Sequence, residues 1–192
     1  MMKSRVIHLS KTSRILLSIL LVCILLISLS IKPIQKLIYP MGYESIVTEM
    51  ADQYGISPSL IYAIIHTESK FDPHALSPAN ARGLMQITED TYQWICQRTG
   101  HTFLDADSLY DPQENIFCGV ALVGLLQEQF DPIETILAAY NAGQGKVNEW
   151  LKDPICSADG ITLQHIPDEE TENYVRRVIN TQQKYQKLYN IP

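Results

Sequence analysis

The chain of 192 residues is 46% hydrophobic and 19% charged, which fits one globular domain and excludes a largely disordered or low-complexity protein. Its formal charge of −6 is unevenly spread, because the first 36 residues hold six Lys and Arg residues and no acid, whereas residues 37–192 carry −12. An acidic body of this kind repels a phosphate backbone, so no nucleic-acid partner is expected.

An apolar run over residues 15–31, ILLSILLVCILLISLSI, is the first element in the chain. It has the length of a short membrane helix and follows the basic residues Lys3, Arg5, Lys11 and Arg14, a charge bias that keeps the N-terminus in the cytoplasm. We therefore expect a cytoplasmic segment over 1–14 and an uncleaved transmembrane anchor over 15–31. A cleaved signal peptide is the main alternative, and lipidation of Cys23 is disfavoured by the large Val22 before it.

The remainder of the chain is expected on the extracytoplasmic side of the cell membrane. Residues 32–42, with Pro33 and Pro40, resemble a stalk before a domain over 43–192. Three cysteines lie in that domain, Cys96, Cys118 and Cys156. We expect these cysteines to be three buried thiols, with a Cys96–Cys118 disulfide as the alternative. Their spacing fits no zinc site.

The domain shows helical periodicity almost throughout. Tyr43, Ile46, Val47, Met50 and Tyr54 share one helix face, which Gly55 ends, and Ser57 with Pro58 predicts the capped start of the next helix. Helices are expected over 43–54, 58–69, 88–98, 112–129, 132–140, 145–151 and 167–189. Strands are nearly absent, with a small ribbon near 84–87 as the alternative. The sequence thus predicts an all-α domain.

Glu68 is the first candidate for chemistry. It ends the second of these helices, whose residues Leu60 to Ile65 are apolar nearly all round, so the helix belongs in the core. Partial burial and the negative end of the helix both raise the pKa of a carboxyl group. A carboxyl that keeps its proton near neutral pH can serve as a general acid. The alternative is an ordinary surface Glu at a helix end.

Five motifs in order resemble the soluble lytic transglycosylase (SLT-domain) family, which is related to goose-type lysozyme. They span about 43–189 and read Glu68-Ser69-x-Phe71-x-Pro73; Ser77-Pro78 with Gly83-Leu84-Met85-Gln86; Asp111-Pro112-x-x-Asn115-Ile116-x-x-Gly119; Ala138-Ala139-Tyr140-Asn141-Ala142-Gly143-x-Gly145-x-Val147; and Glu170-Thr171-x-x-Tyr174-Val175. Asn80, where the family often has Gly, tolerates the left-handed conformation. The resemblance implies a lysozyme-like helical fold.

The resemblance also implies roles for single residues. Glu68 matches the catalytic acid and base, and Tyr140 matches a floor residue whose hydroxyl points at that carboxyl. The other matched positions are substrate-binding: Ser77 near the scissile sugar, Met85 and Gln86 along the glycan groove, Asn141 on the floor, and Glu170 in a later motif. Each has a structural alternative, such as a core position for Met85, a loop-backbone partner for Gln86 and a turn for Asn141.

The implied reaction is non-hydrolytic cleavage of the β-1,4 bond between N-acetylmuramic acid and N-acetylglucosamine in peptidoglycan, with a 1,6-anhydro product. One carboxylate suffices because the sugar's own 6-hydroxyl is the nucleophile, whereas most glycosidases need two. A muramidase, a non-catalytic glycan-binding subunit and a membrane-tethered structural protein are the alternatives. We expect a monomer bound to glycan strands, with no cofactor and no metal.

Overall fold

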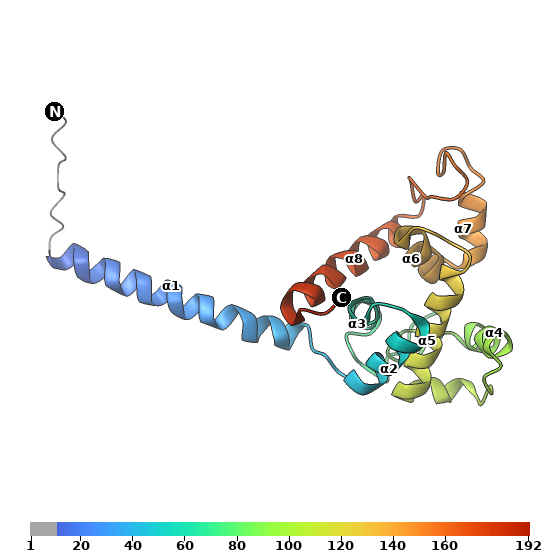
Figure 1. Ribbon diagram of the computed structural model, residues 1–192, viewed down its shortest axis with the longest axis horizontal. Helices are drawn as coiled ribbons and strands as arrows, with labels where there is room; N and C mark the ends of the chain where they lie inside the picture. The colour runs from blue at the N-terminus through green and yellow to red at the C-terminus, as the bar shows by residue number, and fades with distance from the viewer. Residues whose placement is uncertain (1–10) are drawn as a thin grey trace. The chain divides into compact units, whose positions relative to one another are not determined.

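The computed structural model describes residues 11–192, and of residues 13, 14, 18 and 21–30 it describes the backbone alone. The chain divides at residue 40 into an N-terminal unit and a domain of residues 41–192. Helix α1 (Lys11–Ile38) makes up most of the first unit and contains Pro33 (Figure 1). Residues 32–38, expected as part of a stalk, are therefore helical.

The predicted membrane crossing is not supported by the structure. Among the described residues, which leave out the side chains of residues 13, 14, 18 and 21–30, no helix is long and apolar enough to span a membrane. Much of the anchor predicted over 15–31 therefore has side chains outside the described part of the chain. The basic residues Lys3 and Arg5 lie outside the described part of the chain.

The domain is helical, as predicted. Its elements are α2 (Glu44–Tyr54), α3 (Pro58–Glu68), α4 (Glu89–Thr99), the 3₁₀ helix η1 (Ala106–Tyr110), α5 (Pro112–Gln127), α6 (Ile133–Ala142), α7 (Gln144–Trp150) and α8 (Glu169–Tyr189). Between 41 and 192 the structure contains no strand: the ribbon considered near 84–87 is reduced to isolated bridges of Arg82 with Leu76 and Ile87. Helix η1 was not predicted.

Several helix ends follow local chemistry. Gly55 adopts φ 65° and ends α2, and the Asp111 carboxylate accepts the amides of Gln113 and Glu114 at the start of α5. Thr88 caps α4 as predicted. Ser57 stands at the N-cap position of α3 but makes no capping hydrogen bond; its hydroxyl donates to the Pro192 carbonyl and lies 2.8 Å from the Ser59 hydroxyl.

Helix α3 lies at the centre of the domain. Its residues from Ser59 to Ile65 are all buried, and it packs most extensively on α8, which also contacts α6 (Figure 1). A helix that is apolar on every side has to be surrounded, so this burial follows from the sequence. Its C-terminal end consequently emerges from the core at a fixed place, beside α8.

The cysteines of the domain are all free and buried. Cys96, Cys118 and Cys156 form no disulfide, and burial raises the pKa of each thiol. The prediction of three buried thiols is confirmed for these positions. The side chain of Cys23 lies outside the described residues. Among those that are described, no group of His, Cys, Asp and Glu side chains is arranged to hold a metal ion.

Candidate active site

Glu68 is the last residue of α3, where the helix leaves the core. The chain then turns through Lys70 and Phe71, whose φ angles of 53° and 69° lie in the left-handed region that non-glycine residues seldom adopt. The Phe71 ring packs 6.3 Å from Tyr62 and 6.5 Å from His66, centroid to centroid. Packing against the helix thus holds a strained turn directly after the carboxyl group.

The pKa of Glu68 is raised to about 7, and burial is the main cause. The Tyr174 hydroxyl and the positive charge of Arg177, both on α8, act in the opposite direction. The buried Tyr174 hydroxyl forms no hydrogen bond with any described residue. It therefore lies close enough to Glu68 to influence the pKa of the carboxyl, but outside hydrogen-bonding geometry. At neutral pH the carboxyl therefore exists in both protonation states, as a group that gives and takes a proton must.

Two parallel tyrosine rings adjoin this carboxyl. Tyr140 of α6 and Tyr174 of α8 stack with ring centroids 6.4 Å apart and an interplanar angle of 3°. Burial, and then the charge of Glu68, raise the pKa of both phenols well above the ordinary value, so both are protonated donors. The Tyr140 hydroxyl donates to the Met85 carbonyl at 2.8 Å. Its direction toward Glu68, which the resemblance implies, stays a prediction. The Tyr174 hydroxyl also lies close to the carboxyl.

The loop over 75–87 is held by a buried amide. Asn115 is fully buried in α5; its oxygen accepts the Met85 amide at 2.7 Å, and its nitrogen donates to the carbonyls of Arg82 and Leu109 at 2.8 and 2.7 Å. Gly83 lies against it so closely that a Cβ there would stand 2.3 Å from the Asn115 amide nitrogen. The loop that borders Glu68 is thereby fixed to the core.

Three predicted groove residues lie in this loop and differ in their surroundings. Met85 is fully buried, with its side chain against Gly119, so only its backbone reaches the site. Gln86 donates its amide to the carbonyls of Gly83 and Ala75, the loop-backbone role considered as its alternative. Ser77 is half-buried and accepts the Ala81 amide at 3.1 Å.

The remaining two predicted residues lie at the junction of α6 and α8. Asn141 is exposed, and its oxygen accepts a hydrogen bond from the Thr171 hydroxyl at 2.9 Å. Glu170 is exposed in the first turn of α8. Asn141 thus joins the helix that carries Tyr140 to the helix that carries Tyr174.

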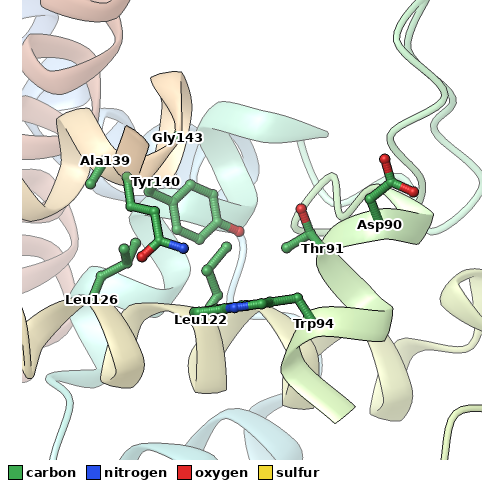
Figure 2. A pocket seen from close by; sticks show the side chains of 9 residues that line it. Asp90, Thr91, Trp94, Leu122, Leu126, Ala139, Tyr140 and Gly143 are labelled. Atoms are coloured by element: carbon green, nitrogen blue, oxygen red, sulfur yellow. The ribbon is translucent and has the colours of Figure 1, made fainter. Parts of the chain in front are cut away.

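A hollow of about 220 Å³ extends from Tyr140 between α4, α5 and α6. Figure 2 shows Tyr140 and Thr91 reaching into it from opposite sides, with Trp94 and Leu122 along one wall. Apolar and aromatic walls with a few polar groups are typical of small-molecule and sugar sites. Tyr140 links this hollow to Glu68, although Glu68 itself does not line it.

Sequence reasoning missed two residues of the site. Tyr174 appears in the fifth motif, but its helical spacing indicated only a core position, and Arg177 carried no signal. Both act on Glu68 because α8 packs along α3, a tertiary contact. The motif itself was the one available signal for Tyr174.

The domain is similar to known proteins in sequence and in fold. The family model described as "Transglycosylase SLT domain" matches residues 45–157. The chain is 34% identical over 169 residues to membrane-bound lytic murein transglycosylase C of Glaesserella parasuis, covering 76% of this chain and 46% of that protein, and 32% identical over 168 residues to the Serratia proteamaculans protein of that name, covering 76% and 47%. The chain therefore spans about half the length of these curated relatives.

The domain is also similar in fold to solved structures. The 70 kDa soluble lytic transglycosylase of Escherichia coli superimposes with a TM-score of 0.74 at 29% identity, over 81% of this chain and 26% of that one. An inactive mutant of the lytic transglycosylase Slt from Pseudomonas aeruginosa gives a TM-score of 0.71 at 30% identity, over 82% and 26%. The lysozyme-like helical fold implied by the five motifs is confirmed.

Proposed function

Because the chain belongs to the transglycosylase SLT domain family, we propose that it is a lytic transglycosylase of peptidoglycan. It cleaves the β-1,4 bond between N-acetylmuramic acid and N-acetylglucosamine and leaves a 1,6-anhydro end. The observation that carries this proposal is the carboxyl of Glu68, whose pKa burial raises to about 7 beside two protonated phenols. The names of the relatives, lytic murein transglycosylases, support the same substrate.

In the proposed reaction Glu68 acts twice. Its protonated carboxyl first gives a proton to the glycosidic oxygen, and the bond to C1 breaks while the N-acetyl group of the muramic residue assists. The resulting carboxylate then takes the proton of the sugar's 6-hydroxyl, whose oxygen attacks C1. Glu68 ends protonated again, and no water is consumed. A pKa near neutrality suits both steps.

The neighbouring residues position the carboxyl and the sugar. Tyr174 faces Glu68 and holds its pKa below the value that burial alone would give. Tyr140, fixed through the Met85 carbonyl, forms the floor between Glu68 and the hollow along α4. We assign glycan contacts to Ser77, Gln86, Asn141 and Glu170, and to Met85 a contribution from its backbone alone.

Replacement of Glu68 by Gln tests the assignment. The variant should release soluble muropeptides from purified sacculi about 10²–10⁴-fold more slowly, because one group serves both proton transfers. Glu49→Gln is the matched control: it removes an exposed carboxyl of α2 that is not among the residues assigned to the site, and it should keep turnover within a few-fold. Normal turnover by Glu68→Gln would remove Glu68 from the mechanism.

The stability of the same variant shows whether it is folded. The folded state raises the pKa of Glu68 from 4.5 to about 7, so ionisation destabilises the native state increasingly as the pH rises from about 4.5 to about 7. Replacement of Glu68 by Gln removes this destabilisation, because the amide does not ionise. Glu68→Gln should therefore gain about 2–3 kcal/mol in free energy of unfolding at pH 8 and nothing at pH 4, by urea denaturation.

The mass of the wild-type products identifies the reaction. An anhydro-muropeptide is one water lighter than the hydrolysed form, so mass spectrometry separates the two chemistries. Fully hydrated products would leave Glu68 as the acid and replace the transglycosylase by a muramidase.

We further propose that residues 15–31 tether the domain to the cell membrane in a single pass, with the domain on the side of the cell wall. The apolar run and the basic residues before it support this topology, as do the relatives' names, which include "membrane-bound". A tether of this kind would keep the enzyme close to its polymeric substrate.

A further inference from the structure

Glu68 stands where a helix is least rigid. It is the last residue of α3, and the final turn of a helix frays unless neighbouring groups hold it. Beyond Ser69 the chain enters the turn in which Lys70 and Phe71 have positive φ angles, a conformation that costs free energy. A carboxyl that transfers protons has to be held in one place, so a contact from outside the helix is needed at this end.

The Ser69 hydroxyl makes such a contact. It donates a hydrogen bond to the Leu84 carbonyl at 2.8 Å and lies 3.2 Å from the Ile65 carbonyl in the last turn of its own helix. The bond to Leu84 joins residues that are fifteen positions apart in the chain. The end of α3 is thereby attached to the loop over 75–87.

This loop is a firm point of attachment. Leu84 is fully buried, and both polar backbone groups of Met85 beside it are engaged, the amide by Asn115 of α5 at 2.7 Å and the carbonyl by Tyr140 of α6 at 2.8 Å. Side chains from α3, α5 and α6 thus converge on the peptide groups of two adjacent residues. Because the bonds from α5 and α6 hold the loop, the bond from Ser69 fixes the helix end relative to Tyr140.

The residue before Glu68 carries a hydroxyl with a different role. The Thr67 hydroxyl donates to the Ala63 carbonyl at 2.7 Å, a bond that stays within α3. Thr67 and Ser69 therefore flank Glu68 with hydroxyls of similar chemistry, and of the two it is Ser69 that reaches the loop. Comparison of the two positions separates attachment of the helix end from the mere loss of a hydroxyl.

We propose that Ser69 is a positioning residue for Glu68, which holds the end of α3 in place through its hydrogen bond to the Leu84 carbonyl. This inference rests on the proposed function, and it adds the residue that places the acid relative to the glycan. Ser69 acts through Glu68 and does not itself transfer a proton. Without its hydroxyl the helix end is released from the loop, so the carboxyl meets the glycosidic oxygen less often and is reached by more water.

The kinetics of Ser69→Ala with soluble glycan strands test the proposal. We expect kcat to fall about 10–10²-fold with KM within about twofold of the wild type, because the lost contact places the acid and does not bind the strand. Burial is the main cause of the raised pKa of Glu68, so greater access of water should lower that pKa and move the alkaline limb of the pH–rate profile to lower pH. Ser69→Thr, which keeps a hydroxyl, should restore both properties.

Thr67→Ala is the matched control. It removes the flanking hydroxyl without detaching the helix from the loop, so kcat and the alkaline limb should stay as in the wild type. If urea denaturation shows that Ser69→Ala is not folded, Ser69→Cys takes its place, because the thiol is close in size to the hydroxyl and donates only weakly. Wild-type kcat with an unmoved limb in the folded Ser69 variant, or equal losses in Thr67→Ala, would overturn the proposal.

Titration of the Glu68 carboxyl separates this failure from failure of the proposed function, because it needs no turnover. The titration is followed by NMR of protein labelled at the glutamate carboxyl carbons, and Glu68→Gln identifies the signal. A midpoint that falls in Ser69→Ala and not in Thr67→Ala supports the positioning role, even where wild-type protein leaves glycan strands intact and the cleavage is refuted. An unchanged midpoint in folded Ser69→Ala contradicts the positioning role.

Discussion

Glu68 is subject to opposing influences that come from different parts of the chain. Burial at the end of α3 raises its pKa, while Tyr174 and Arg177 on α8 lower it. If burial acted alone, the pKa of the Glu68 carboxyl would be higher still. If α8 acted alone, it would be an ordinary ionised Glu. The packing of α8 on α3 therefore sets the acid strength of the site.

Removal of the Tyr174 hydroxyl should change the pH profile. Tyr174→Phe takes away an influence that lowers the pKa of Glu68, so that pKa rises further. Because cleavage begins from protonated Glu68, the alkaline limb of the pH–rate profile should move to higher pH. The measurement is kcat/KM against pH with soluble glycan strands.

Tyr62→Phe is the control for this shift. It also deletes a buried hydroxyl without a hydrogen-bond partner among the described residues, but the groups acting on it are Glu44 and Tyr189 and not Glu68. Its alkaline limb should not move. An unmoved limb in Tyr174→Phe as well would mean that the phenol does not act on the carboxyl.

The sequence leads to Glu68 because its position depends on local features, an apolar helix and its end. The partners of Glu68 depend on contacts between segments far apart in the chain, and periodicity can indicate only that Tyr174 faces the core. Met85 shows a further limit. In a loop without a repeating period, the sequence does not determine whether a side chain points to the groove or to the core, and the contact with Gly119 decides it.

At the scale of elements, Asn115 joins η1, α5 and the loop over 75–87. Asn115→Ala leaves the Met85 amide and two carbonyls without their partner in a buried position. The free energy of unfolding should fall by about 3 kcal/mol or more, since each unsatisfied group costs about 1–3 kcal/mol. Urea denaturation measures this loss. Asn148→Ala, an exposed position of α7, should change stability by less than about 0.5 kcal/mol.

Elements with strong local signals were predicted well. The cap of α4 and the glycine after α2 are chemical features of a few adjacent residues. The capping hydrogen bond expected from Ser57 is absent, and its hydroxyl donates to the Pro192 carbonyl, a contact with the far end of the chain that adjacent residues cannot indicate. Helix η1 escaped prediction because a single 3₁₀ turn has too few residues to establish a period.

At the scale of the whole molecule, the separation of charge along the sequence bears on topology. The basic N-terminal residues and the acidic domain are on opposite sides of the apolar run over 15–31. If that run is an uncleaved tether, protease added to intact protoplasts should degrade the domain and leave a small fragment in the membrane. Immunoblotting against tags at both ends distinguishes the two parts.

Replacing residues 1–31 with a cleavable secretion signal supplies the control, because the domain should then leave the cells in soluble form. A mature wild-type protein that starts after residue 31 and washes off the membrane would contradict the tether.

The Met85 side chain is buried in the core, whereas its carbonyl accepts a hydrogen bond from Tyr140 in the site. Substitutions at this position are therefore limited by the packing of the side chain against Gly119, and this limit does not depend on the substrate. The exposed residues Asn141 and Glu170 have no such restriction. Divergence in substrate range among descendants of this sequence should accumulate at such exposed positions, while the backbone that shapes the site is inherited unchanged with the core.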